Sequence, residues 1–139
     1  MLKPKDLGIS IKERNALVKV RDGLQAGEYV HVKEPIYRYV PCKKPIFNMV
    51  EFEGEFDCGT VRCIGGWVAH LCDNFSPRSY VCNAEGPLGE LYFPLGGDGG
   101  NDDYAYSRIT PKQAAKAITN FLDTGKPEWR KVLRIKQAA

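Results

Sequence analysis

The segment that runs from residue 110 to residue 125 constrains the fold more than any other part of the chain. Thr110 and Gln113 have the spacing of a capping box at the start of a helix, and Pro111 lies at the first helical position. Gly125 lies where such a helix would end. Apolar side chains recur at helical spacing between these limits, at Ala114, Ala117, Ile118, Phe121 and Leu122. We therefore expect a helix with one buried face.

A second helix is predicted near the N-terminus, over residues 10–24. Ser10 and Glu13 have the spacing of another capping box, and Gly27 follows the last apolar position. One face of this helix would carry Ala16, Leu17, Val20 and Leu24. A short helix is also expected around Trp129, after the break at Gly125.

A further helix is predicted to begin at Thr60 and to continue through the sequence VRCIGGWVAHLC. Ile64, Trp67 and Leu71 lie on its apolar face and are expected to pack against the apolar stripe of residues 114–122. Two adjacent glycines inside a helix each cost about 1 kcal/mol relative to alanine. We therefore expect another backbone to approach this helix closely.

Aromatic and β-branched residues are concentrated in two short runs, residues 29–32 and 36–40, on either side of the Glu34-Pro35 turn. This pattern predicts a β-hairpin. Further strands are predicted within residues 45–57, 78–82 and 90–93, and a glycine-rich polar loop at residues 96–103. The whole pattern predicts a single α+β domain, residues 1–139, in which two or three helices pack on a short antiparallel sheet or hairpin.

The cysteine content predicts the compartment. There are five cysteines, an odd number, and the first residues contain no apolar run of signal-peptide length. No stretch approaches the roughly 18 uninterrupted apolar residues that a membrane helix needs. We therefore expect free thiols in a reducing cytoplasm and no membrane partner.

Two blocks of the chain carry a recognisable motif order. Residues 47–49 are Phe-Asn-Met, and residues 58–67 fit the pattern Cys-Gly-Thr-x-x-Cys-Ile-x-Gly-Trp. Residues 108–129 read RITPKQAAKAITNFLDTGKPEW. In these blocks the chain resembles a widespread group of small, uncharacterised phage and bacterial proteins. The resemblance implies a phage or mobile-element accessory protein, located in the host cytoplasm, and implies no activity.

A cysteine nucleophile is the main enzymatic alternative. Cys58 precedes the predicted start of a helix, where the positive end of the helix dipole lowers a thiol pKa. His31 would have to supply the base, because His70 lies roughly 15 Å further along the same helix. Small buried cysteines that allow close packing explain the same residues. We therefore prefer a binding role to catalysis and keep Cys58 and His31 as the alternative catalytic pair.

No metal or cofactor is predicted. The separations between the cysteines do not match those of zinc-binding pairs. Asp98, Asp102 and Asp103 offer carboxylate oxygens, but the segment lacks the spacing and the terminal glutamate of a calcium loop. A solvated turn accounts for them better.

The charge is segregated along the chain, with a net charge of +5 for residues 1–44, −8 for residues 45–103 and +6 for residues 104–139. Tyrosine and arginine anchor many protein interfaces, and rings interleaved with bases also suit nucleic acid. The predicted binding surface consists of Tyr29, Tyr37, Arg38, Tyr39, Asp98, Asp102, Asp103 and Tyr104. We therefore expect a binding module for a host macromolecule, with a protein preferred as the partner and a nucleic acid as the alternative.

Overall fold

The computed structural model describes residues 1–31, 45–49, 54–56, 59–72, 81, 83–95, 100–101 and 104–135. The helices are α1 (Pro4–Leu7), α2 (Ile11–Ala26), α3 (Ile64–Leu71), α5 (Gly86–Tyr92), α6 (Pro111–Thr124) and α7 (Trp129–Leu133), with a 3-10 turn at Tyr106–Arg108. The strands are β1 (Val30–His31), β2 (Ile46–Phe47), β3 (Gly54–Phe56), β4 (Gly59–Arg62), β5 (Gly100–Asn101) and β6 (Tyr104–Ala105).

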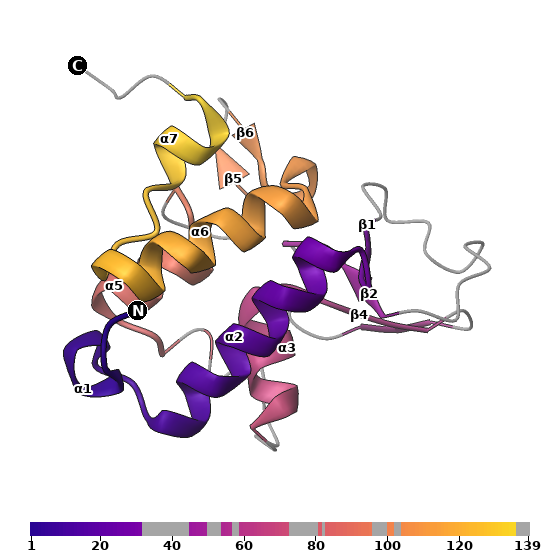
Figure 1. Ribbon diagram of the computed structural model, residues 1–139. Coiled ribbons are helices and arrows are strands. Elements are labelled where there is room, and N and C mark those ends of the chain that lie inside the picture. The colour runs from indigo at the N-terminus through magenta and orange to yellow at the C-terminus, as the bar shows by residue number, and fades with distance from the viewer. Residues whose placement is uncertain are drawn as a thin grey trace.

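The two long helices, α2 and α6, lie side by side and cross one another (Figure 1). Both begin with the predicted capping boxes: the Ser10 hydroxyl accepts from the Glu13 N–H at 3.0 Å, and the Thr110 hydroxyl accepts from the Gln113 N–H at 3.2 Å. Both end at a glycine in the left-handed conformation, Gly27 and Gly125. The predictions for these helices, and for the short helix around Trp129, are confirmed.

The sheet corrects one part of the prediction. The strand order is β1-β2-β4-β3; β1 pairs with β2 in parallel, β2 pairs with β4 in parallel, and only β3 runs antiparallel to β4. The α+β class is confirmed, but the expected antiparallel sheet is mainly parallel. A residue period of two identifies a strand without fixing the direction of its neighbour, and parallel neighbours need a long crossover rather than a tight turn. Residues 32–44, which hold most of the predicted hairpin, lie outside the described residues.

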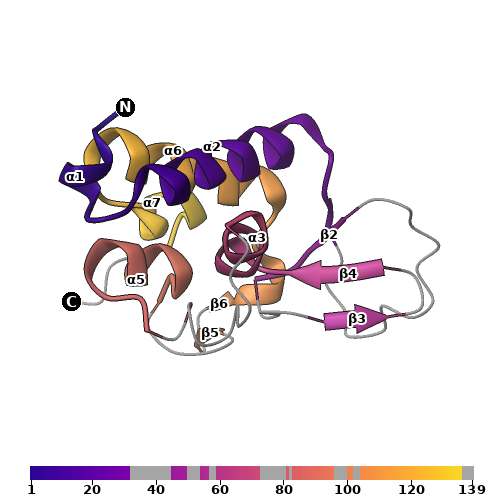
Figure 2. The ribbon, with the colours of Figure 1, turned by 90° about the horizontal axis from the view of Figure 1, so that it is seen from below.

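The helix predicted to begin at Thr60 begins later. Thr60 belongs to β4 and pairs with Glu55, and β4 leads directly into α3 (Figure 2). The N-cap of α3 is Cys63, whose sulfur accepts from the Gly66 N–H at 3.4 Å. Strands on both sides of β4 keep residues 59–62 extended, which overrides the local capping signal.

At Gly65, the first glycine of the predicted close approach, the nearest neighbours are side chains. A Cβ atom on Gly65 would collide with the Val81 side chain and lie 3.3 Å from the Tyr92 ring. No other backbone atom is among these nearest neighbours. The sequence correctly indicated a tight contact but not its chemical nature.

Buried residues from α1 to α7 form one hydrophobic cluster. Trp67 and Ile64 are buried in it as predicted, whereas Leu71 is 38% exposed, so that part of the prediction is wrong. The Trp67 indole N–H donates to the Ile46 carbonyl at 3.2 Å, which ties α3 to β2. Leu71 is the last residue of α3.

Two further predictions need correction. Residues 90–93, predicted as a strand because of their aromatic side chains, belong mainly to α5, which buries Leu91 and Tyr92. Within the predicted loop, Gly100–Asn101 forms β5 and pairs with β6 in an antiparallel ladder. The strand predicted within residues 45–57 is present as two separate short strands, β2 and β3.

Candidate functional site

Tyr29, the first residue of the predicted binding surface, is directed towards the core. Its ring meets the Trp67 ring edge-on, with 5.2 Å between the ring centroids. The same ring covers Gly23, where a Cβ atom would lie 2.6 Å from a Tyr29 ring carbon. Burial raises the pKa of the Tyr29 phenol above its ordinary value of 10.0, and the nearby Glu28 carboxylate adds to the shift. Tyr29 therefore stabilises the fold at the end of α2.

His31 connects β1 to the turn that precedes α6. Its Nε2 atom lies 2.9 Å from the Ser107 carbonyl oxygen, and its ring packs at 6.2 Å from the Phe47 ring. A carbonyl only accepts hydrogen bonds, so Nε2 carries the proton in this contact. That nitrogen is therefore not the basic one, and Cys58, its proposed partner, lies outside the described residues.

Tyr104 is half-buried, and the Arg108 guanidinium carbon lies 4.6 Å from its ring centroid. Through His31 and Ser107, the structure brings the start of the segment 29–40 next to the residues that follow Tyr104. The other predicted binding residues lie outside the described residues: Tyr37, Arg38, Tyr39, Asp98, Asp102 and Asp103.

Two free thiols lie in the part of the chain that the structure describes. Cys63 is buried at the start of α3, and the Cys72 thiol donates to the Lys12 carbonyl at 3.7 Å. Within the same residues, no three His, Cys, Asp or Glu side chains are grouped so that they could hold a metal ion. None of the helices described there has the length and apolar character needed to cross a membrane.

A row of polar side chains runs along the outer face of α6. Lys112, Lys116, Asn120 and Thr124 are spaced four residues apart, so they form one ridge of the helix. At a rise of 1.5 Å per residue the row extends for about 18 Å. It lies on a different side of α6 from the buried apolar stripe, and both of its lysines are exposed.

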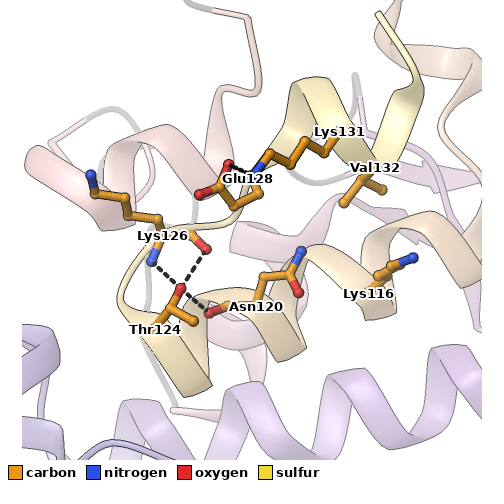
Figure 3. A pocket seen from close by; sticks show the side chains of 7 residues that line it. All are labelled: Lys116, Asn120, Thr124, Lys126, Glu128, Lys131 and Val132. Carbon is orange, nitrogen blue, oxygen red and sulfur yellow. Dashed lines mark hydrogen bonds and ion pairs between the residues drawn. The ribbon is translucent and has the colours of Figure 1, made fainter.

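A hollow of about 450 Å³ lies between this row and α7 (Figure 3). It is lined by Lys116, Asn120, Thr124, Lys126, Glu128, Lys131 and Val132. Figure 3 shows Glu128 and Lys131 on the α7 side of the hollow, facing Lys116 and Asn120 on α6. The hollow is open to solvent, so a ligand can reach it without a rearrangement of the fold.

Hydrogen bonds hold the turn between α6 and α7 in place. The Thr124 hydroxyl donates to the Asn120 carbonyl at 2.8 Å and accepts from the Lys126 N–H at 3.3 Å. The Asn120 side-chain amide donates to the Pro127 carbonyl at 3.1 Å. These contacts fix the backbone that carries Lys126, so its ammonium group is presented from an ordered turn.

A second hollow, of about 500 Å³, lies on the other side of the row, towards the end of α2. It is lined by Gln25, Lys112, Ala115, Lys116 and Thr119. Lys116 lines both hollows. We call the surface that carries Lys112, Lys116, Lys126 and Lys131 the lysine face.

The lysine face is little neutralised. Glu128 is the only carboxylate that lines either hollow in the described residues, and it lies 3.8 Å from the Lys131 ammonium group. Lys112, Lys116 and Lys126 make no ion pair with any other residue that the structure describes. Exposed ammonium groups that lack ion-pair partners attract anions, and phosphate groups are among the anions that lysine binds.

The lysine face was not predicted from the sequence, although two signals for it were present. The net charge of +6 over residues 104–139 pointed to this part of the chain. The spacing of four between Lys112 and Lys116, within a confidently capped helix, places them on one ridge. The contribution of α7 depends on tertiary packing and has no local signal.

Comparisons of the chain with protein-family models, with curated proteins and with solved structures found no match. The resemblance to small phage and bacterial proteins therefore stays a prediction that depends on the motifs of residues 47–67 and 108–129.

Proposed function

We propose that this chain is a binding protein whose lysine face holds the sugar–phosphate backbone of double-stranded nucleic acid without reading its sequence. The observation that carries the proposal is the grouping of four lysines around two adjoining hollows that contain a single carboxylate. Such a surface neutralises phosphates and releases their counterions, which is the main source of sequence-independent affinity. The proposal keeps the predicted class, a binding module for a macromolecule.

Nucleic acid is preferred over a protein partner because of what lines the hollows. Protein interfaces are depleted in lysine and enriched in aromatic residues at their centres. The described lining has four lysines and no aromatic ring, and its apolar residues are Ala115 and Val132. The predicted protein partner of residues 29–40 stays a separate prediction, since Tyr29 packs on Trp67 and the residues after His31 lie outside the described ones.

A duplex is preferred over a single strand by a related argument. Proteins that hold single strands without sequence preference stack the bases on aromatic side chains. The lysine face offers the bases no such ring among its described residues, and asparagine, threonine and glutamine suit contacts with phosphates and sugars. Contacts restricted to the backbone fit a duplex, whose bases are paired.

The proposal is tested by fluorescence anisotropy with a labelled duplex of mixed sequence in a salt series. Four phosphate contacts predict a slope of about −3.6 in a plot of log K against log salt. Affinity should therefore fall roughly 100-fold between about 50 and 200 mM salt. A second duplex of unrelated sequence should bind equally well, and a single strand of the same length should bind more weakly.

Two double variants with equal changes in net charge make the test specific. Lys112→Ala with Lys116→Ala removes half of the lysine face, and Lys5→Ala with Lys12→Ala removes two exposed lysines of α1 and α2. We expect the first pair to weaken binding by roughly 50-fold or more at about 0.1 M salt and the second to change it little. Absence of duplex binding at low salt, or an equal loss in both variants, would show the proposal to be wrong.

A further inference from the structure

We infer that the two hollows form one groove, and that a single backbone strand of the duplex passes from one to the other over Lys116. The inference rests on the proposed function and adds the path, the length and the central contact of the bound strand. Lys116 is the residue that lines both the hollow next to α2 and the hollow next to α7.

The helical geometry of α6 places the two hollows on either side of its outer ridge. Successive residues of a helix turn by about 100°. Ala115 and Thr119 therefore face the side of Gln25 on α2, and Asn120 and Thr124 face the side of α7. A strand that occupies both hollows must cross the ridge between these sides, and Lys116 is the residue at the crossing.

The dimensions of the ridge define the bound length. From Lys112 to Thr124 the row extends for about 18 Å along the helix axis. One strand of a duplex carries a phosphate for about every 3.4 Å of the duplex axis, so a duplex laid parallel to this row passes roughly five phosphates of one strand along it. Lys112 and Lys116 lie within this length, and Lys126 and Lys131 lie beyond its end, in the turn after α6 and in α7.

Glu128 marks the edge of the path. Its carboxylate lies on the α7 side of the second hollow, beside Lys131, and a phosphate next to it would be repelled (Figure 3). The strand is therefore expected to run on the α6 side of the hollow, from Lys116 towards the turn that carries Lys126, and Lys131 contacts it by leaving Glu128.

The decisive measurement is the stoichiometry of binding to a short hairpin whose stem is about as long as the groove. One groove predicts one hairpin per chain in a titration far above the dissociation constant. Lys112→Ala, which changes only the first hollow, and Lys131→Ala, which changes only the second, should each weaken this single event roughly tenfold at about 0.1 M salt. Each of these two variants should also reduce the slope of log K against log salt by about 0.9. Lys116→Ala should weaken hairpin binding most. Lys5→Ala is the control and should leave hairpin binding unchanged.

The outcomes separate this inference from the proposed function. Two hairpins per chain, with Lys112→Ala affecting one and leaving the other intact, would overturn the single groove while leaving nucleic-acid binding in place. A single hairpin whose affinity responds to Lys112→Ala but not to Lys131→Ala would also overturn it. Failure of every hairpin and duplex to bind would remove the proposed function together with the groove.

Discussion

The two faces of α6 are made from the same fourteen residues and have opposite properties. On the inner face, Ile118, Phe121 and Leu122 are 0% exposed and hold the hydrophobic cluster together. On the outer face, Lys112 and Lys116 are exposed and make no ion pair with any residue that the structure describes. Buried and exposed positions alternate along this one helix, so a substitution on the outer face can test the proposed binding and spare the core.

Phe121→Ala, on the inner face of α6, is expected to cause the largest loss of stability. Truncation of a fully buried phenylalanine removes apolar contacts and leaves a cavity, so the free energy of unfolding should fall by about 3–5 kcal/mol. Urea denaturation measures the loss. Under conditions in which the variant stays folded, its affinity for a duplex should equal that of the original chain. A variant as stable as the original would contradict the assignment of the inner face to the core.

Thr110→Ala tests the N-cap of α6, which supports the inner and the outer face of the helix alike. The alanine cannot accept from the Gln113 N–H, so the free energy of unfolding should fall by about 1 kcal/mol. Thr110→Ser keeps the accepting oxygen and is the matched control, with little expected loss. If serine and alanine destabilise the chain equally, then the side-chain cap is not the cause.

Lys112→Glu should move stability and binding in opposite directions. A glutamate in the first turn of α6 interacts favourably with the helix dipole and with Lys116 four residues later. The free energy of unfolding should rise by about 0.5–1 kcal/mol, while duplex binding weakens by more than tenfold. Lys112→Gln, which only removes the charge, should weaken binding less. A loss of both stability and binding would show that the outer face also supports the fold.

Replacement of Tyr29 is expected to have the smallest effect on stability. It tests whether Tyr29 belongs to the core or to a binding surface. Its phenol has a pKa raised above 10.0 in the folded chain, so the folded state retains a proton that the unfolded state loses first. The contribution of the protonated Tyr29 phenol to the free energy of unfolding is complete below pH 10. It is lost as the pH rises through the pKa of Tyr29 in the folded chain. Tyr29→Phe should therefore show a smaller loss of stability above pH 10 in urea denaturation. Identical pH dependence in both chains would place the Tyr29 phenol in water.

The elements that could be predicted from the sequence are those fixed by neighbouring residues. The caps of α2 and α6 are formed within four residues, at Ser10 with Glu13 and at Thr110 with Gln113, so local chemistry determines them. Thr60 carried only part of this signal, a capping residue without Glu or Gln three residues later, and pairing of β4 with strands on both sides prevailed. Strand direction likewise depends on partners distant in the sequence.

The candidate site was harder to predict because surface position is not a local property. Tyr29 has the composition of an interface anchor, yet its contact with Trp67 turns it inwards. Lys112 and Lys116 could be placed on one ridge from their spacing, but the two hollows beside Lys116 require α2 on one side and α7 on the other to pack against α6. The residues at 37–39 and 98–103 stay predictions from the sequence.

The packing of α2 against α6 also has a consequence during synthesis of the chain. α2 is made first and can contact α3 early, but its more extensive contact is with α6, which begins at Pro111. All of residues 27–110 must leave the ribosome before this contact forms, so the core closes by a long-range step. Until then the part of α2 that α3 does not cover stays exposed to chaperones and proteases. The contact between the two long helices therefore forms only after α6 has been synthesised.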